Sequence, residues 1–260
     1  ISRATFTLFV ASHSGYERLP QAVRHRRFVF HFGENLYLIR DVAIGAGTHL
    51  LETSWHFAPE LEISQYGREF IAAIPRAKGA TAESAHLSLL PVEDSRWKVA
   101  VRSKFVSRCY GEKMSAPVLR CAAGVALPAE TAMLLATAAE AKNGRDKPTR
   151  LVREQLASYQ PHLPDAVYKY EQGNVTHAVV FSRPGVARWR YGAWASDAQL
   201  LYFRMTDARI ERIVLCEGTF AQFGGKDLIS RDGPLKWLEW NQDGRQEQVA
   251  CSDPTAVRAF

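Results

Sequence analysis

Short segments in which apolar and polar residues alternate recur through most of this chain. In segment 96–106, we expect Trp97, Val99, Val101 and Phe105 to point inward and Lys98, Arg102 and Lys104 to point outward. Successive side chains of a strand point to opposite faces, so a period of two indicates a strand that is buried on one face. Segments of the same kind are 5–11, 23–32, 36–42, 49–57, 166–182 and 198–218.

Turn residues separate these segments at short intervals. Gly173-Asn174 predicts a two-residue hairpin turn, and a second turn is expected near Asp207. Only segments 128–142 and 148–160 have helical character, and the apolar run of the first is equally compatible with a buried strand. The sequence therefore predicts an all-β fold: an antiparallel β-sandwich of many short strands with at most one or two short helices.

The length of 260 residues fits one large β domain, because sandwiches often reach about 200–250 residues as one unit. A polar stretch with Gly and Pro makes 140–150 the best candidate for an internal loop boundary. We therefore predict a single β-sandwich domain over residues 1–260. Because the chain starts inside a strand-like segment without Met, we interpret it as the C-terminal part of a longer protein.

The formal net charge of +6 favours an anionic partner such as acidic polysaccharide, nucleic acid or anionic lipid. The sequence has no uncharged apolar run of about 18 residues, so we expect no membrane partner. The four cysteines form no C-x-x-C pair, which argues against a zinc ribbon. The spacing of Cys109 and Cys121 permits a disulfide, but small buried thiols are the simpler interpretation.

The sequence around the eight histidines contains none of the common catalytic or metal-binding motifs. There is no H-x-H, no H-E-x-x-H and no G-x-S-x-G element, so no catalytic residue is assigned. A weak alternative is a metal site made of His25, Asp41 and His56, should three successive strands bring them together. The competing interpretation is that these histidines lie on a polar strand face.

Basic and aromatic residues alternate in the segment "ARWRYGAW" (187–194). Arg188, Arg190 and Trp194 are candidate substrate-binding residues, because sugar rings stack on aromatic faces and Arg binds carboxylate or sulfate in bidentate fashion. The same combination of arginines and aromatic rings would also suit single-stranded nucleic acid, in which phosphates pair with arginine and bases stack on the rings. The structural alternative places the aromatics in the core and the arginines outside, and alternation alone favours it.

A basic cluster opens the strand segment 23–32, and Asp41 follows the next turn. Residues 27 and 41 each lie seven positions from residue 34, the centre of the Gly33-Glu34-Asn35 turn. This symmetry predicts that Arg27 and Asp41 face each other across two antiparallel strands, and that their ion pair fixes the register.

Segment 15–59 resembles the C-terminal β region of the heparinase II/III-like polysaccharide lyases. That family has a Gly-Tyr pair, an H-x-R or H-R-R strand, a hairpin ending in aspartate, and a strand ending W-H-x-x-P. The matching residues here are Gly15-Tyr16, His25-Arg26-Arg27, Asp41, Trp55-His56 and Pro59, with weaker likeness at 127–137 and 197–204.

The resemblance implies an N-terminal α/α toroid joined to an antiparallel β-sandwich. Such enzymes cleave uronate-containing chains, such as heparan sulfate, other glycosaminoglycans or alginate, by β-elimination. The family motifs H-x-H-A-D, D-P-G-T and H-N-T, which carry a catalytic His and the metal ligands, are absent from this chain. The resemblance thus implies the β-domain of a lyase that is not catalytic alone; a non-catalytic carbohydrate-binding or assembly module is the alternative.

The resemblance also implies a partner and a location. Tyr16, His25 and Arg27 become candidate contacts to an acidic polysaccharide, although a structural role for the basic cluster is favoured. No cofactor is expected in this chain, and a divalent metal such as zinc would belong to the full-length parent. The toroid of the same protein is the expected partner, and nucleic acid is disfavoured. The implied location is periplasmic or secreted in a bacterium, with the cytoplasm left open because no signal peptide is visible.

Overall fold

The structure is a computed structural model that describes residues 1–3, 5–33, 35–75, 86–137, 150–156, 165–186, 188–243 and 246–253. These residues form 21 strands and, within the described ranges, no helix. Every pairing whose register is described is antiparallel, as in the hairpin of β2 and β3. The all-β antiparallel prediction is confirmed. Among the described residues, no helix has the length and apolar character needed to cross a membrane.

The two segments with helical character are strands where they are described. Residues 129–137 form β10, which pairs with β3 on one side and β7 on the other. A strand in this position is buried on both faces, so its apolar run has no polar alternation. Residues 150–155 form β11. Tertiary pairing overrode helix propensity at both places.

The chain divides into two compact units, residues 1–150 and 151–260. The division directly follows the predicted boundary segment 140–150, of which residues 140–149 lie outside the described residues. That the whole chain is a single domain stays a prediction.

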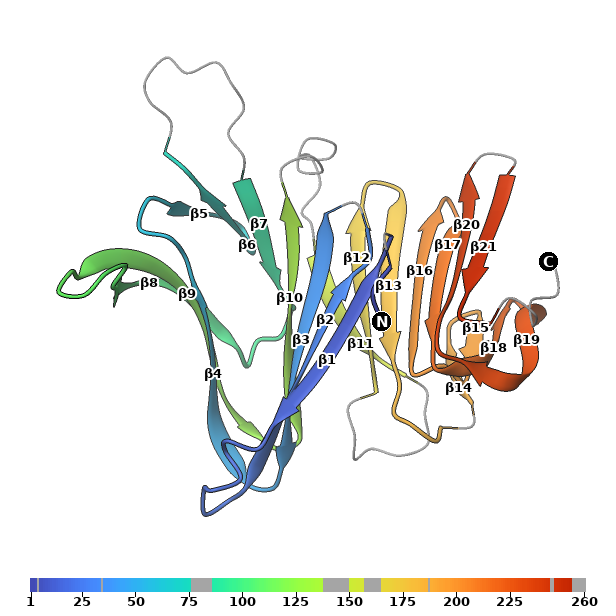
Figure 1. Cartoon of the computed structure of the whole chain (residues 1–260), viewed down its shortest axis with the longest axis horizontal. Helices are drawn as coiled ribbons and strands as arrows, with labels where there is room; N and C mark the ends of the chain where they lie inside the picture. The colour runs from blue at the N-terminus through green and yellow to red at the C-terminus, as the bar shows by residue number, and fades with distance from the viewer. Residues whose placement is uncertain are drawn as a thin grey trace. The chain divides into compact units, whose positions relative to one another are not determined.

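The first unit contains two sheets, which Figure 1 shows in blue to green. In spatial order, the seven-stranded sheet is β1 (Thr7–His13), β2 (Val23–His31), β3 (Leu36–Gly45), β10 (Ala129–Thr137), β7 (His86–Pro91), β6 (Glu69–Ala73) and β5 (Glu62–Tyr66). The three-stranded sheet is β4 (Thr48–His56), β9 (Met114–Ala126) and β8 (Lys98–Val106).

A shared hydrophobic core joins the two sheets of the first unit. The larger sheet contributes Phe70, Leu89 and Met133, and the three-stranded sheet contributes Leu119 and Cys121. Partly buried side chains from β4, among them Trp55, pack against this cluster. The unit is therefore a two-layer β-sandwich.

The second unit repeats this two-layer plan with its own strands. In spatial order, its seven-stranded sheet is β11 (Arg150–Gln155), β12 (Ala166–Gln172), β13 (Val175–Phe181), β16 (Leu200–Thr206), β17 (Arg209–Cys216), β20 (Leu238–Asp243) and β21 (Gln246–Cys251). Its four-stranded sheet is β14 (Trp189–Tyr191), β15 (Trp194–Ser196), β18 (Gly218–Phe223) and β19 (Lys226–Leu235).

The two predicted hairpin turns of the second unit are present. Gly173 has a φ of 60° between β12 and β13, and Asp207 has a φ of 48° between β16 and β17. The four cysteines are free thiols in the structure, so the Cys109–Cys121 spacing is not used for a disulfide. Burial raises the pKa of the Cys121 thiol to about 11, which keeps this thiol protonated and unreactive.

Candidate functional site

Arg27 and Asp41 form a bidentate ion pair across β2 and β3, as the symmetry of the hairpin predicts. The two residues face each other directly in the register. Arg27 donates from Nε to Oδ1 at 2.7 Å and from Nη2 to Oδ2 at 2.8 Å. These hydrogen bonds raise the pKa of Arg27 above its ordinary value, against a smaller opposing effect of burial. The guanidinium therefore keeps its charge at neutral pH.

His25 shares the same carboxylate. Its Nε2 lies 2.7 Å from Asp41 Oδ1, and its Nδ1 lies 3.1 Å from Nε2 of His13 on β1. His13 faces His25 directly in the β1–β2 register. Together, His13, His25, Arg27 and Asp41 form what we call the His–Asp cluster.

The hydrogen bonds assign the ring tautomers of both histidines, although they do not show the hydrogens. The backbone N–H of Gly15 donates to His13 Nδ1 at 3.2 Å, so His13 carries its proton on Nε2. His13 Nε2–H then donates to His25 Nδ1, and His25 Nε2–H donates to Asp41. One consistent chain of donors thus leads from the Gly15 amide to the Asp41 carboxylate.

Burial differs sharply among the members of the cluster. The side chain of Asp41 is 9% exposed, whereas that of Arg27 is 43% exposed and that of His25 is 25% exposed. The guanidinium carbon of Arg27 lies 6.0 Å from the centre of the Trp55 ring on β4. Asp41 is therefore a buried hydrogen-bond acceptor, whereas the guanidinium of Arg27 is partly exposed to solvent.

Tyr16 lies beside the cluster in the loop between β1 and β2. Its ring centre is 5.1 Å from that of His13, and the residue is 49% exposed. In the same loop, Glu17 accepts a hydrogen bond from Arg24 Nε at 2.8 Å. The structure thus brings three predicted substrate-binding residues, Tyr16, His25 and Arg27, into one neighbourhood.

The members of the cluster differ in how much of their hydrogen-bonding capacity is already used. A general base needs a free lone pair within reach of the proton that it removes. All four ring nitrogens of His13 and His25 already take part in hydrogen bonds. The half-exposed guanidinium of Arg27 still has N–H groups to offer, and these suit a carboxylate or sulfate group.

The structure does not assemble the metal site proposed as a weak alternative. His25 and Asp41 meet, but His56 lies on β4 of the other sheet, where it faces Val118 on β9. Within the described ranges, no group of three or more His, Cys, Asp or Glu side chains is placed to hold a metal ion.

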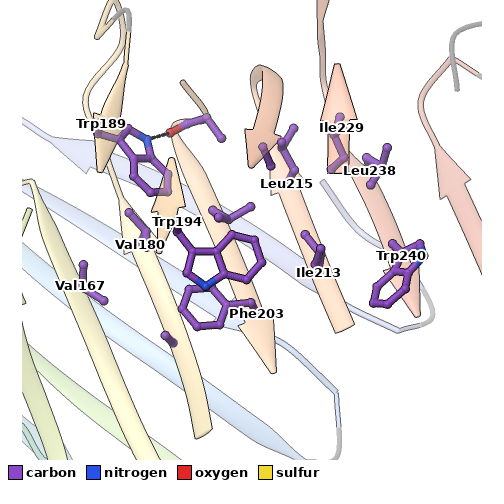
Figure 2. Close-up of a cluster of buried hydrophobic side chains, with 14 of the residues drawn as sticks. Val167, Val180, Trp189, Trp194, Phe203, Ile213, Leu215, Ile229, Leu238 and Trp240 are labelled. Atoms are coloured by element: carbon purple, nitrogen blue, oxygen red, sulfur yellow. Dashed lines mark hydrogen bonds between the residues drawn. The ribbon is translucent and has the colours of Figure 1, made fainter. Parts of the chain in front are cut away.

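The candidate residues of the second unit separate into core and surface. Trp194 is 3% exposed and stacks on Phe203 with ring centres 4.4 Å apart, so the proposal that it stacks a sugar is wrong (Figure 2). Trp189 is also buried, and its Nε1 donates to the carbonyl of Ala198. The structural alternative for "ARWRYGAW" is the correct one: aromatics inward and arginines outward.

Arg188 and Arg190 do lie on the surface of the second unit. Arg188 donates to Gln222 and lies over the Phe220 ring, with its guanidinium carbon 5.0 Å from the ring centre. Substrate binding by these two arginines stays a prediction.

Sequence reasoning missed two parts of the polar architecture. The first is His13, which joins the cluster because residues 13 and 25 are symmetric about residue 19. Its pairing was not predicted, because the loop that connects β1 and β2 has no recognisable hairpin turn. The second is the buried ion pair of Arg40 and Glu130, in which Arg40 Nε donates to Glu130 at 2.7 Å. These two residues are 90 positions apart, and only the β3–β10 pairing brings them together.

Comparisons with known proteins bear on the first unit. Residues 3–125 match the protein family described as "Heparinase II/III-like, C-terminal". This range holds the whole His–Asp cluster and nearly all of the three-stranded sheet. A search of curated protein sequences found no match.

Two solved structures show a distant similarity of fold. They are the heparan sulfate lyase HepC from Pedobacter heparinus, at 12% identity and a TM-score of 0.48, and a mutant of it, at 12% identity and a TM-score of 0.45. The matches cover 65% and 69% of this chain, but only 25% and 30% of those chains. This chain therefore spans less than a third of the length of those proteins.

Proposed function

We propose that the chain is the β-domain of a polysaccharide lyase acting on acidic, uronate-containing polysaccharide, because residues 3–125 match the family described as "Heparinase II/III-like, C-terminal". The family match is the observation that carries the proposal. The cationic character of the chain, with a formal net charge of +6, agrees with an anionic substrate.

The proposed reaction is β-elimination. A base removes the C5 proton of the uronate, and electron density moves toward the neighbouring carboxylate. The C4–O bond then breaks, its electron pair leaves with the sugar oxygen, which a general acid protonates, and a C4–C5 double bond remains. Catalysis needs a free base and donors that neutralise the carboxylate. The His–Asp cluster offers donors through Arg27, but its imidazoles have no free nitrogen in this arrangement.

We therefore assign binding to this chain and the chemistry to the rest of the parent enzyme. Arg27, with Tyr16 and His25 beside it, would contact a carboxylate or sulfate of the polysaccharide. The base, the α/α toroid and any divalent metal would belong to parts of the enzyme outside the residues described. A periplasmic or secreted location in a bacterium goes with this proposal, because a long acidic polysaccharide does not cross a membrane unaided.

The test is a lyase assay on the complete polypeptide that the gene encodes. We expect it to form the ultraviolet-absorbing unsaturated uronate from heparan sulfate or alginate, and no such product from a neutral glucan. A complete polypeptide that binds these acidic chains without cleaving any of them would refute the lyase assignment. It would support the alternative, a non-catalytic carbohydrate-binding or assembly module.

A further inference from the structure

The outward face of the three-stranded sheet is strongly curved. On this face, Glu52 of β4 lies opposite Ala122, and Lys104 of β8 lies opposite Ala116. Six residues of β9 separate these two positions, which is about 20 Å along a flat strand. Yet Lys104 Nζ and Glu52 Oε1 are 3.9 Å apart. A flat sheet would hold them farther apart than the two side chains can span, so the sheet must be concave on this side.

Figure 1 shows the same curvature in the arched course of β9. Of the residues of β9 on this side, Gly124 is exposed and Arg120 is partly exposed, whereas Ala116, Val118 and Ala122 are buried. The opposite side of β9, with Leu119 and Cys121, belongs to the core. The accessible part of the concave side is therefore formed by its longer side chains and not by its small residues.

Cationic side chains line this concave face from two strands. Lys98, Arg102 and Lys104 come from β8, and Arg120 comes from β9, where it faces Ala100. His56 of β4 and Arg102 of β8 lie on either side of Val118. We call this set the cationic concave face.

Within the described ranges, Glu52 is the only carboxylate that forms an ion pair with a cation of this face, and its partners are Lys104 and Arg120. Arg120 donates from Nε to Glu52 at 2.6 Å, and this hydrogen bond lowers the pKa of Glu52. Lys98 and Arg102 are exposed, and their side chains make no ion pair or hydrogen bond with any other described residue. The face thus keeps a surplus of positive charge that the described part of the protein does not neutralise.

We propose that the cationic concave face is a second binding site for a linear acidic polysaccharide, separate from the His–Asp cluster. An extended polyanion would follow β8, with carboxylate or sulfate groups on Lys98, Arg102 and Lys104. The proposal rests on the proposed function for the class of its ligand. The family match supports that class, because it covers the three-stranded sheet up to residue 125.

Two other interpretations make different predictions. Edge strands often carry lysines only to prevent pairing with another chain, and then removing charge would leave polysaccharide affinity unchanged. Single-stranded nucleic acid would need aromatic side chains on which bases stack. Among the residues of the cationic concave face, no Phe, Tyr or Trp is present, which favours a polysaccharide.

The test compares two charge-matched pairs of substitutions in the whole chain. Lys98→Gln/Arg102→Gln removes the two cations of the face that have no partner among the described residues. Lys226→Gln/Lys236→Gln removes two exposed lysines of the second unit and serves as the control. Calorimetric titration with a heparan sulfate oligosaccharide should show affinity weakened about fivefold or more for the first pair and less than about twofold for the control. Equal effects of the two pairs would overturn the proposal.

Glu52→Gln gives a test of the opposite sign. Because this carboxylate competes with the ligand for Arg120 and Lys104, its removal should strengthen heparan sulfate binding by about twofold to fivefold. Weaker heparan sulfate binding by a folded Glu52→Gln variant would contradict the proposal.

Hydrogen exchange on the unaltered chain gives a further check, since the oligosaccharide should protect amides of β8 more than those of β19. Protection confined to other strands would overturn the site.

The ligand class has its own control. Single-stranded DNA, titrated at the same salt concentration, should bind more weakly than heparan sulfate, and tighter binding of this DNA through the cationic concave face would overturn the polysaccharide assignment. The proposed lyase function and the proposed second binding site can fail independently of each other. If the complete polypeptide cleaves nothing but the Lys98/Arg102 pair still controls heparan sulfate binding, this site stands and the lyase does not. If it cleaves and the pair has no effect on affinity, the reverse holds.

Discussion

The ion pair of Arg27 and Asp41 allows a sharp double-mutant test, because its two partners differ in burial. Asp41 is 9% exposed and accepts hydrogen bonds from Arg27 and His25, whereas Arg27 is 43% exposed. Arg27→Ala removes two charge-assisted hydrogen bonds and leaves a buried carboxylate with His25 as its remaining partner. Asp41→Ala leaves a guanidinium that can still reach water.

The structure predicts that the two single substitutions are not equally harmful. Stranding a fully buried charge costs about 3–5 kcal/mol, and the exposure of Arg27 reduces this because solvent screens its side of the pair. We therefore expect Arg27→Ala to lower the free energy of unfolding by about 2–4 kcal/mol. For Asp41→Ala we expect about 1–3 kcal/mol, chiefly from lost hydrogen bonds.

The double variant should be clearly more stable than the sum of the single effects predicts. Contacting residues of this kind give coupling energies of about 0.5–3 kcal/mol. Urea unfolding followed by tryptophan fluorescence measures the cycle, and hydrogen exchange at the amides of β2 and β3 localises the change to the first unit. Strict additivity would mean that Arg27 and Asp41 do not interact, and it would refute the predicted geometry of the hairpin.

Three further predictions concern buried groups. Glu130→Ala should lower the free energy of unfolding by about 3–5 kcal/mol, because it leaves Arg40 buried without its carboxylate; a loss below about 1 kcal/mol in urea unfolding would contradict a buried ion pair. Trp194→Ala should cost about 3–5 kcal/mol through lost core packing and leave heparan sulfate affinity unchanged, whereas reduced affinity of the folded variant would restore a role in sugar binding. Burial, with a smaller contribution from the charge of Arg212, lowers the pKa of His177 to about 4. The unfolded chain takes up this proton near pH 6.5 and the folded chain only near pH 4, so stability should fall by up to about 3 kcal/mol as the pH falls between these values. His177→Gln should flatten this dependence in unfolding experiments across that range, and an unchanged pH profile would contradict the neutral buried imidazole.

Local patterns in the sequence were sufficient to predict much of the first unit. Alternation located the strands that became β2, β3, β4 and β8, and the symmetry about residue 34 predicted the pairing of Arg27 with Asp41. Both features are local, because a short turn dictates which residues of a hairpin face each other. The turn at Gly173-Asn174 was predicted correctly for the same reason.

The features that escaped prediction depend on contacts distant in the sequence. The prediction that Phe105 points inward was wrong, because this side chain is 63% exposed and Lys113 Nζ lies 4.0 Å from the centre of its ring. Its end of β8 extends past the core, which alternation does not reveal. The curvature of the three-stranded sheet depends on the pairing of β4 with β9, and the helix-like run 129–137 became a strand only between its two neighbours.

The candidate site was predicted in part. Tyr16, His25 and Arg27 were identified and do lie together, whereas Trp194 proved to be a core residue. Alternation cannot distinguish a buried aromatic from a surface stacking platform, because both occupy every second position of a strand. His13 was missed because its role depends on the long connection between β1 and β2.

The most direct test of the central claim is the formation of unsaturated uronate by this chain alone. The chain is incubated with heparan sulfate or alginate at concentrations at which calorimetry shows the polysaccharide to be bound, and ultraviolet absorbance is followed against a sample without protein. We predict binding with no increase in absorbance, because the His–Asp cluster provides cationic donors but no free base. Sustained turnover by the purified chain would contradict it and would place the chemistry among these residues.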